Sequence, residues 1–184
     1  MPDGQINRRQ ATTDDTAALL SLMDSVLEWL VARGRPEQWG RIPFSRLPGF
    51  PERLANWASQ GVVTMAERDG RCVGLLAMAP TVPQRIPPGL VPEGSMFVYT
   101  VLSSRGPDGR GVGSTLLAEA ERRARAGRAP ALALDHWAGS PELARVYEQH
   151  GYVAVAEYDD AQGSTRNVVR VLRLSATGAG GPAS

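Results

Sequence analysis

The chain has 184 residues, of which 42% are hydrophobic and 21% are charged, so its composition is that of one soluble globular domain and not of a disordered protein. Twenty basic against nineteen acidic residues give a formal net charge of +1, which argues against binding to nucleic acid or to an anionic membrane. All basic residues are arginines, and the absence of lysine excludes enzymes that need a P-loop lysine or a Schiff-base lysine.

The first part of the chain predicts a strand, a helix and an irregular segment. A short edge strand is expected over residues 5–11. Apolar side chains then recur three and four residues apart over residues 14–32, which is the spacing of a helix with one buried stripe. The segment 36–51 is rich in proline, glycine and aromatic residues and predicts a loop. Its Trp39 and Phe44 either plug the core or line a binding site.

The middle of the chain predicts a helix, a hairpin, a loop and a further strand. A short helix over residues 52–59 leads to two β-rich runs, 62–67 and 72–79, which are joined by an Asp-Gly turn typical of hairpins. Residues 80–94 hold five prolines and two glycines and predict a stiff loop. Residues 96–103 then predict a strand.

A glycine-rich turn at residues 105–114 connects this strand to a helix whose apolar face runs from Val112 to Ala124. The succession of strand, turn and helix is the feature of the sequence that carries most chemical information. The remaining expected elements are a strand at 131–135, a helix capped by Ser140 and closed by Gly151, strands at 152–157 and 167–174, and a frayed polar tail at 175–184.

The glycine-rich turn has the pattern of an anion-binding site. Helix N-termini present unpaired N–H groups, and glycines at 109, 111 and 113 let the backbone approach a pyrophosphate closely. A turn that serves only close helix packing would have the same pattern. A P-loop is excluded because it needs a lysine where Ser114 stands. A dinucleotide-binding fingerprint draws support from Asp135 on the next strand, but too few residues follow the turn for a doubly wound sheet.

Around this turn the sequence resembles the GNAT (general-control-related N-acetyltransferase) superfamily. The acyl-CoA loop of that superfamily reads Q/R-x-x-G-x-G/A, and the string here is DGRGVG at residues 108–113. Both glycines match, whereas an aspartate replaces the leading Gln or Arg. Arg105 and Arg110 lie close enough in the sequence to supply positive charge to the phosphates instead.

A second motif of the superfamily follows at the expected place. It is a helix of the form N-x-x-A-x-x-L-Y that ends in Gly-Phe, and it is matched by residues 140–147 and by Gly151-Tyr152, with serine in place of asparagine. The resemblance spans residues 5–174 and is strongest over residues 98–152.

The resemblance implies a single α/β (α+β) domain over residues 1–174, with a mixed central sheet of about six to seven strands, about four flanking helices, and a splay between the fourth and fifth strands. Acetyl-CoA is the implied cosubstrate, with its pantetheine arm paired to the backbone of the fourth strand and its pyrophosphate on the glycine-rich turn. The implied CoA-binding residues are Val101, Leu102, Ser103, Asp108, Gly109, Arg110, Gly111, Val112, Gly113, Ser114 and Ser140.

In such enzymes an amine attacks the thioester directly, so no covalent nucleophile is needed, and Cys72 is expected to be a packed small side chain. The resemblance implies that Tyr147 protonates the departing CoA thiolate, although the spacing of Tyr147 also fits a core aromatic. Glu93, just before the fourth strand, is the first candidate for the general base, and His136 is the second. The other candidates are Tyr99, Thr100 and Asp135.

The sequence therefore predicts an N-acetyltransferase that moves an acetyl group from acetyl-CoA to the primary amine of a small molecule. A non-catalytic acyl-CoA-binding regulatory domain and a peptide or protein N-terminal acetyltransferase are the alternatives, and the stiff loop at 80–94 favours a closed pocket over a peptide groove. One cysteine and two histidines predict no metal site, and the single cysteine fits a reducing compartment. No run approaches eighteen apolar residues, so we expect a cytoplasmic protein, and the near-neutral charge predicts no nucleic-acid or membrane partner. A homodimer is compatible with this prediction.

Overall fold

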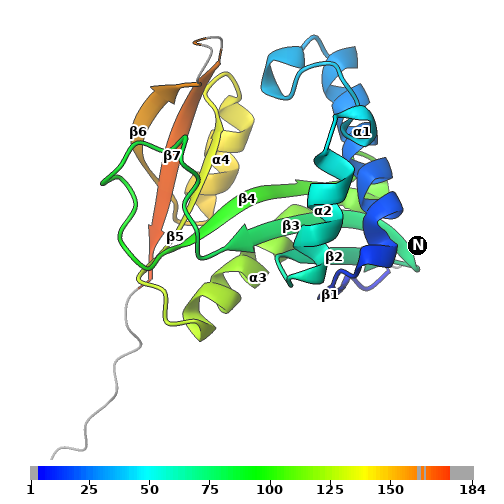
Figure 1. The fold of residues 1–184 in the computed structure, drawn as a ribbon, viewed down its shortest axis with the longest axis horizontal. Helices are drawn as coiled ribbons and strands as arrows, with labels where there is room; N and C mark the ends of the chain where they lie inside the picture. Colours follow the sequence, from blue (N-terminus) through cyan, green and yellow to red (C-terminus); the bar gives the residue numbers. More distant parts are fainter. Residues whose placement is uncertain (1–3, 161–162, 164, 175–184) are drawn as a thin grey trace, which may run out of the picture.

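The computed structural model describes residues 4–160, 163 and 165–174, and the tail expected at 175–184 lies outside this range. In the described part, seven strands form one mixed sheet in the order β1-β2-β3-β4-β5-β7-β6 (Figure 1). Every neighbouring pair is antiparallel except β4 and β5, which are parallel. The strands are β1 (Asn7–Gln10), β2 (Val63–Arg68), β3 (Arg71–Ala79), β4 (Met96–Ser103), β5 (Ala131–Trp137), β6 (Val153–Asp159) and β7 (Arg166–Arg173).

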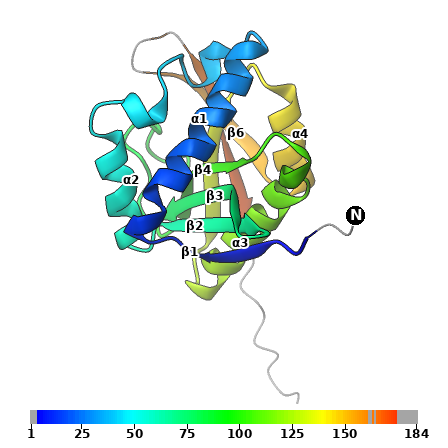
Figure 2. The ribbon, with the colours of Figure 1, turned by 90° about the vertical axis from the view of Figure 1, so that its right-hand side faces the viewer.

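Helices cover both faces of this sheet (Figure 2), and each of the expected helices is present. One face carries α1 (Thr16–Ala32) and α2 (Phe50–Ser59), and the other carries α3 (Val112–Ala126) and α4 (Pro141–Gln149). The predicted apolar stripe of α1 is buried against the sheet, as its spacing of three and four residues requires. None of the helices in the described part is long and apolar enough to cross a membrane.

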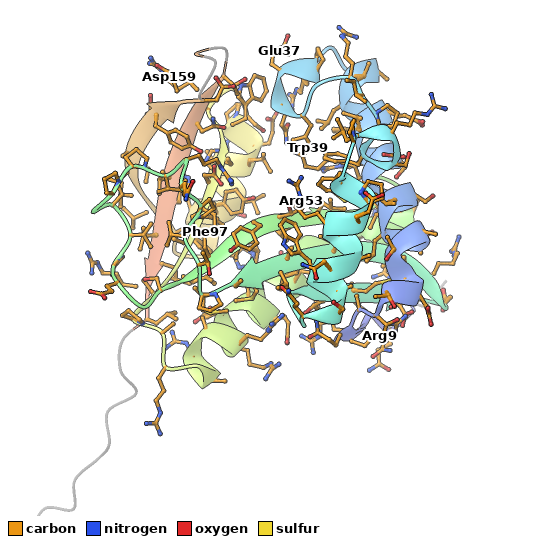
Figure 3. The ribbon with its side chains drawn as sticks, in the orientation of Figure 1. Arg9, Glu37, Trp39, Arg53, Phe97 and Asp159 are labelled. Carbon is orange, nitrogen blue, oxygen red and sulfur yellow. The ribbon has the colours of Figure 1, made fainter. Side chains whose placement is uncertain are left out.

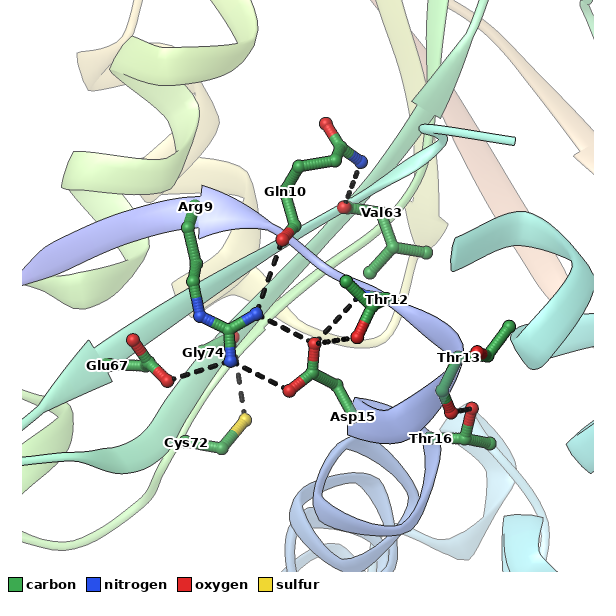
Figure 4. A network of polar contacts seen from close by, with 10 residues as sticks. All are labelled: Arg9, Gln10, Thr12, Thr13, Asp15, Thr16, Val63, Glu67, Cys72 and Gly74. Carbon is green, nitrogen blue, oxygen red and sulfur yellow. Dashed lines mark hydrogen bonds and ion pairs between the residues drawn. The ribbon is translucent and has the colours of Figure 1, made fainter. Parts of the chain in front are cut away.

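Arg9 of β1 ties the first strand to β2 and to the turn before α1 (Figure 4). Its guanidinium donates hydrogen bonds to both carboxylate oxygens of Asp15 at 2.7 Å and to Glu67 at 3.0 Å. Asp15 also accepts hydrogen bonds from the N–H and the hydroxyl of Thr12, which form part of a capping box at the turn before α1. Beside this network, burial raises the pKa of Cys72 to about 11, so the thiol stays protonated and unreactive at neutral pH.

The parallel strands β4 and β5 separate after a short stretch of pairing. They pair only where residues 96–98 lie beside residues 132–134; beyond that point β4 pairs with β3 and β5 pairs with β7. Tyr99 is the extra residue of a bulge at this point, because Val98 pairs with Met78 and Thr100 pairs with Ala77. A bulge bends its strand, so β4 turns away from β5. The expected splay, by which we mean the space between β4 after Val98 and β5 after Leu134, is confirmed.

The proline-rich loop at residues 80–94 folds over the face of the sheet that α1 and α2 leave bare (Figure 1). Its Ile86 is buried against Phe97, which projects from β4 beneath the loop (Figure 3). Two polar contacts fix the loop further: the Tyr99 hydroxyl donates to the Thr81 carbonyl at 2.8 Å, and Arg85 binds a carboxylate at the end of β5. The loop is therefore a fixed wall beside the splay.

Candidate active site

The glycine-rich turn runs from the end of β4 through a short 3-10 turn (Pro107–Gly109) into α3. A Cβ on Gly109 would lie 1.8 Å from the Ser104 carbonyl oxygen, so only glycine allows this close approach of two backbone segments. Gly111 caps α3 with φ +77°, a left-handed conformation that favours glycine. A Cβ built on Gly113 would meet no neighbouring segment within 4 Å, so the space beside the first turn of α3 is open at this position. The structure therefore has a glycine-rich turn before a helix N-terminus, as predicted, and the binding of an anion there stays a prediction.

Arg68 holds the turn from beneath, a contact that the sequence pattern did not reveal. It is 6% exposed, at the end of β2, and its two terminal nitrogens donate to the carbonyls of Asp108 at 2.8 Å and Arg110 at 3.0 Å. The side chain of Asp108, which replaces the Gln or Arg of the motif, is paired with Arg71 at 3.0 Å. The backbone of the turn is therefore positioned by a buried cation.

Replacing Arg68 with methionine is expected to raise the KM for acetyl-CoA about tenfold, because two charge-assisted hydrogen bonds to the turn are lost. The kcat at saturating acetyl-CoA should stay within about twofold, since Arg68 does not face the reacting atoms. Arg71→Met is the matched control and should change neither constant, because its ion pair is exposed. An unchanged KM in a folded Arg68→Met variant would show that the turn needs no support from β2.

Alternation along β4 decides which backbone groups face the splay. Ser104 donates its N–H to Val73 of β3 at 2.9 Å, so Leu102, two residues earlier, also directs its backbone toward β3. Val101 and Ser103 direct theirs to the opposite side, where β5 has moved away. Of the three residues expected to pair with pantetheine, two therefore present backbone groups to the splay and Leu102 does not.

Helix α4 places Tyr147 behind the splay. Ser140 is buried and caps the helix, accepting a hydrogen bond from the Leu143 N–H at 3.4 Å, as its sequence position predicts. The ring of Tyr147 packs 5.3 Å from the ring of His136 on β5 and 5.9 Å from that of Tyr152. Burial raises the pKa of Tyr147 to about 12. Its hydroxyl has no hydrogen-bond partner among the residues that the structure describes, so a donor is available there.

The two candidates for a base on β5 are engaged in other contacts. His136 accepts a hydrogen bond on Nε2 from Arg170 at 2.9 Å, so its proton is on Nδ1 and faces the Trp137 carbonyl at 2.9 Å. Burial, the largest cause, lowers the pKa of His136, which keeps the ring neutral. Asp135 binds Arg85 through both oxygens at 3.0 Å and accepts a hydrogen bond from Tyr158. Both side chains are therefore held by protein partners.

Glu93 lies apart from Tyr147. It is exposed and precedes Met96, which pairs with Leu132 at the closed end of the β4 and β5 pair. His136, the neighbour of Tyr147, is four residues further along β5, a rise of about 13 Å. The structure does not bring the two predicted catalytic residues together, and the role of Glu93 as a base stays a prediction that would require a chain of water molecules.

Glu93→Gln is accordingly expected to leave kcat/KM within about threefold of the wild-type value between about pH 6 and pH 9. The measurement is the pH dependence of acetyl transfer for both proteins. Loss of the ascending limb of the profile in Glu93→Gln would instead identify this carboxylate as the base.

A cavity of about 240 Å³ lies at the open end of the splay, between the last turn of α1 and the first turn of α4. The structure places Arg105 in this cavity, where its guanidinium lies 4.8 Å from the centre of the Trp29 ring. The sequence pattern did not find this cavity, because its lining comes from distant segments. The lining residues are Trp29, Leu30, Arg33, Arg35, Gln38, Arg105, Ser140, Glu142 and Leu143.

Trp39 and Phe44 form a small aromatic cluster against the core under α1 and α2. Their rings meet edge to face at 5.5 Å, and Phe44 lies 5.0 Å from Phe50. Figure 3 shows Trp39 in the connection between the two helices. This packing favours the core interpretation of these aromatics, while Tyr99 stacks on Trp57 at 5.4 Å closer to the splay.

The family model of the acetyltransferase (GNAT) family matches residues 22–152. No curated protein sequence matches the chain. Among solved structures, the ribosomal-protein-alanine N-acetyltransferase of Brucella melitensis has a TM-score of 0.68 at 23% identity and covers 91% of this chain and 99% of its own. The PaiA N-acetyltransferase of Thermoplasma acidophilum, solved in complex with coenzyme A, has a TM-score of 0.66 at 15% identity and covers 92% of this chain and 99% of its own.

Proposed function

Because the chain belongs to the acetyltransferase (GNAT) family, we propose that it transfers an acetyl group from acetyl-CoA to the primary amine of a small molecule, by direct attack and without a covalent enzyme intermediate. Two features support the proposal: the glycine-rich turn, which joins β4 to α3, and Tyr147, whose ring packs against His136 of β5. The turn presents N–H groups for a pyrophosphate, and the tyrosine presents a proton for a leaving group.

CoA is bound by main-chain groups in this proposal. The pyrophosphate lies on the first turn of α3, between Gly111 and Ser114, with Gly109 and Arg68 fixing the shape of the turn. The pantetheine arm enters the splay and pairs with backbone groups of Val101 and Ser103. Ser140 contributes by starting α4 at the position that brings Tyr147 to the splay.

The transfer step needs one bond to form and one to break. The amine nitrogen attacks the thioester carbonyl carbon, and the C–S bond breaks as the C–N bond is completed. Tyr147 donates its hydroxyl proton to the departing sulfur, and the proton lost by the nitrogen returns through water to the phenolate. Amide and CoA thiol are the products. No side chain of the described residues is needed as a nucleophile, in keeping with the unreactive Cys72.

The fixed loop at residues 80–94 supports a small acceptor. Contacts from Arg85 to Asp135 and from Tyr99 to Thr81 hold it beside the splay, where an extended peptide would need an open groove. The Brucella enzyme is named for a protein acceptor, so peptide acceptors belong in the test. The experiment is to follow thiol release from acetyl-CoA with a panel of small amines and of peptides. Release with peptides alone would contradict the small-molecule proposal, and binding without release would favour a regulatory domain.

The pH dependence of kcat should lack a descending limb from Tyr147. Because burial raises the pKa of Tyr147 to about 12, the hydroxyl keeps its proton at lower pH and loses it only as the pH rises through that value. We expect a plateau of kcat from about pH 8 to about pH 10 in a stopped assay at saturating substrates. A fall in kcat with a midpoint near the ordinary tyrosine pKa would show that the phenol is solvated, contrary to the structure.

A further inference from the structure

The cavity at the open end of the splay is lined by three arginines, and two of them, Arg33 and Arg105, contact the same aromatic ring. Arg33 and Arg105 both lie over the ring of Trp29, at 4.1 Å and 4.8 Å from its centre. Within the described residues neither guanidinium forms an ion pair with a carboxylate. Cation–π contact with an indole orients a guanidinium but leaves its N–H donors free.

The carboxylate that lines the same cavity is already engaged. Glu142 pairs with Arg35 at 3.0 Å and also accepts a hydrogen bond from Ser140 at 3.3 Å. Arg35, through its hydrogen bond, holds the pKa of Glu142 down at about 2, so the group stays ionised. Arg35 and Glu142 thus neutralise each other, whereas Arg33 and Arg105 keep their positive charges available to a ligand.

The cavity lies between the start of the glycine-rich turn and the start of the helix that carries Tyr147. Arg105 follows β4 by two residues, at the start of the glycine-rich turn, and it lines the cavity together with Ser140. The helix that carries Tyr147 begins at Ser140, in the cavity wall. A volume of about 240 Å³ suits a small group rather than a whole cofactor. The pyrophosphate has its own donors on α3.

We propose that Arg33 and Arg105, held on Trp29, bind a carboxylate of the substrate. This inference rests on the proposed acyl transfer. The carboxylate has two sources: the acceptor amine, as in an amino acid, or the far end of a dicarboxylic acyl chain. In both cases the two guanidinium groups can form charge-assisted hydrogen bonds with the two oxygens of a carboxylate. A neutral carboxamide lacks the negative charge and binds more weakly, so the arginines select the carboxylate.

The test compares matched substrates in two arms. One arm measures kcat/KM with acetyl-CoA for free amino acids and for the same amino acids as carboxamides. The other arm compares kcat/KM for acetyl-CoA with kcat/KM for succinyl-CoA, with an amino acid carboxamide as the acceptor. We expect the wild type to prefer the carboxylate by about thirtyfold or more in one arm, which identifies the source, and Arg33→Met/Arg105→Met to reduce that preference to about threefold or less. Methionine keeps the apolar stem over Trp29 while removing the charge.

Arg41→Met is the matched control. Arg41 is an exposed arginine between α1 and α2, and it does not line the cavity. Equal kcat/KM for both members of each pair, or a preference that survives in the double variant, would overturn the proposal. So would a loss of CoA affinity of tenfold or more in the double variant, because the arginines would then bind a phosphate of CoA. If no amine is acylated, the proposed function is contradicted, but the carboxylate site can still be tested. Calorimetry on the CoA-bound protein then compares the affinity for an amino acid with the affinity for its carboxamide.

Discussion

Tyr147→Phe is expected to lower kcat by about ten- to a thousandfold, while folding and acetyl-CoA affinity stay near the wild-type values. Phenylalanine keeps the ring that packs against His136 and Tyr152 and removes only the hydroxyl. Because that hydroxyl has no hydrogen-bond partner among the described residues, its removal costs no structural contact. The measurement is steady-state acetyl transfer together with calorimetric titration of CoA.

Tyr152→Phe provides the matched control for this variant. Tyr152 is a second buried tyrosine beside Tyr147, and its hydroxyl also lacks a partner in the described part of the chain. Removing an unpartnered buried hydroxyl should leave kcat within about twofold and should not lower the melting temperature. Wild-type kcat in Tyr147→Phe would return Tyr147 to a structural role, with water protonating the thiolate.

Gly113→Asp is expected to weaken acetyl-CoA binding by about a hundredfold or more without destabilising the fold. A side chain at this position enters open space, and its carboxylate would lie where the pyrophosphate approaches the first turn of α3. In the free protein the same charge is favourable, because carboxylates stabilise helix N-termini. The variant should therefore retain or exceed the wild-type melting temperature while losing its ligand.

Gly113→Asn separates charge from size in this experiment. The amide has nearly the shape of the carboxylate but no charge, so its effect on CoA affinity should be much smaller than that of aspartate. A melting curve and a calorimetric titration of CoA decide the outcome for both variants. Unchanged affinity in Gly113→Asp would place the pyrophosphate away from the turn. Gly111 and Gly109 are less suitable for this test, because both positions exclude side chains for backbone reasons.

Local patterns predicted the elements of this fold, but they did not predict its long-range contacts. The spacing of apolar residues places α1, and the Asp-Gly pair places the β2–β3 hairpin, because both signals act between near neighbours in the chain. The splay was expected only from the family resemblance. Its structural cause, the bulge at Tyr99 and three residues of pairing between β4 and β5, depends on register between distant segments.

The same division holds for the site. The glycine-rich turn and the position of Tyr147 could be read from short motifs, whereas the contacts that decide a residue's chemistry could not. Both nitrogens of His136 are engaged by groups on β5 and β7, and Arg68 reaches the turn from β2. Arg33 at the end of α1 and Arg105 after β4 contact the same Trp29 ring only in the folded chain. No motif brings such residues together in the sequence.

A crystal structure of the protein with CoA is the most direct test of whether CoA binds in the splay with its sulfur beside Tyr147. The proposed mechanism requires the pyrophosphate within hydrogen-bond distance of the N–H groups between Gly111 and Ser114 and the pantetheine arm beside β4 in the splay. It also requires the CoA sulfur within hydrogen-bond distance of the Tyr147 hydroxyl. A bound CoA whose sulfur lies outside the splay, with Tyr147 still enclosed by its neighbours, would contradict it.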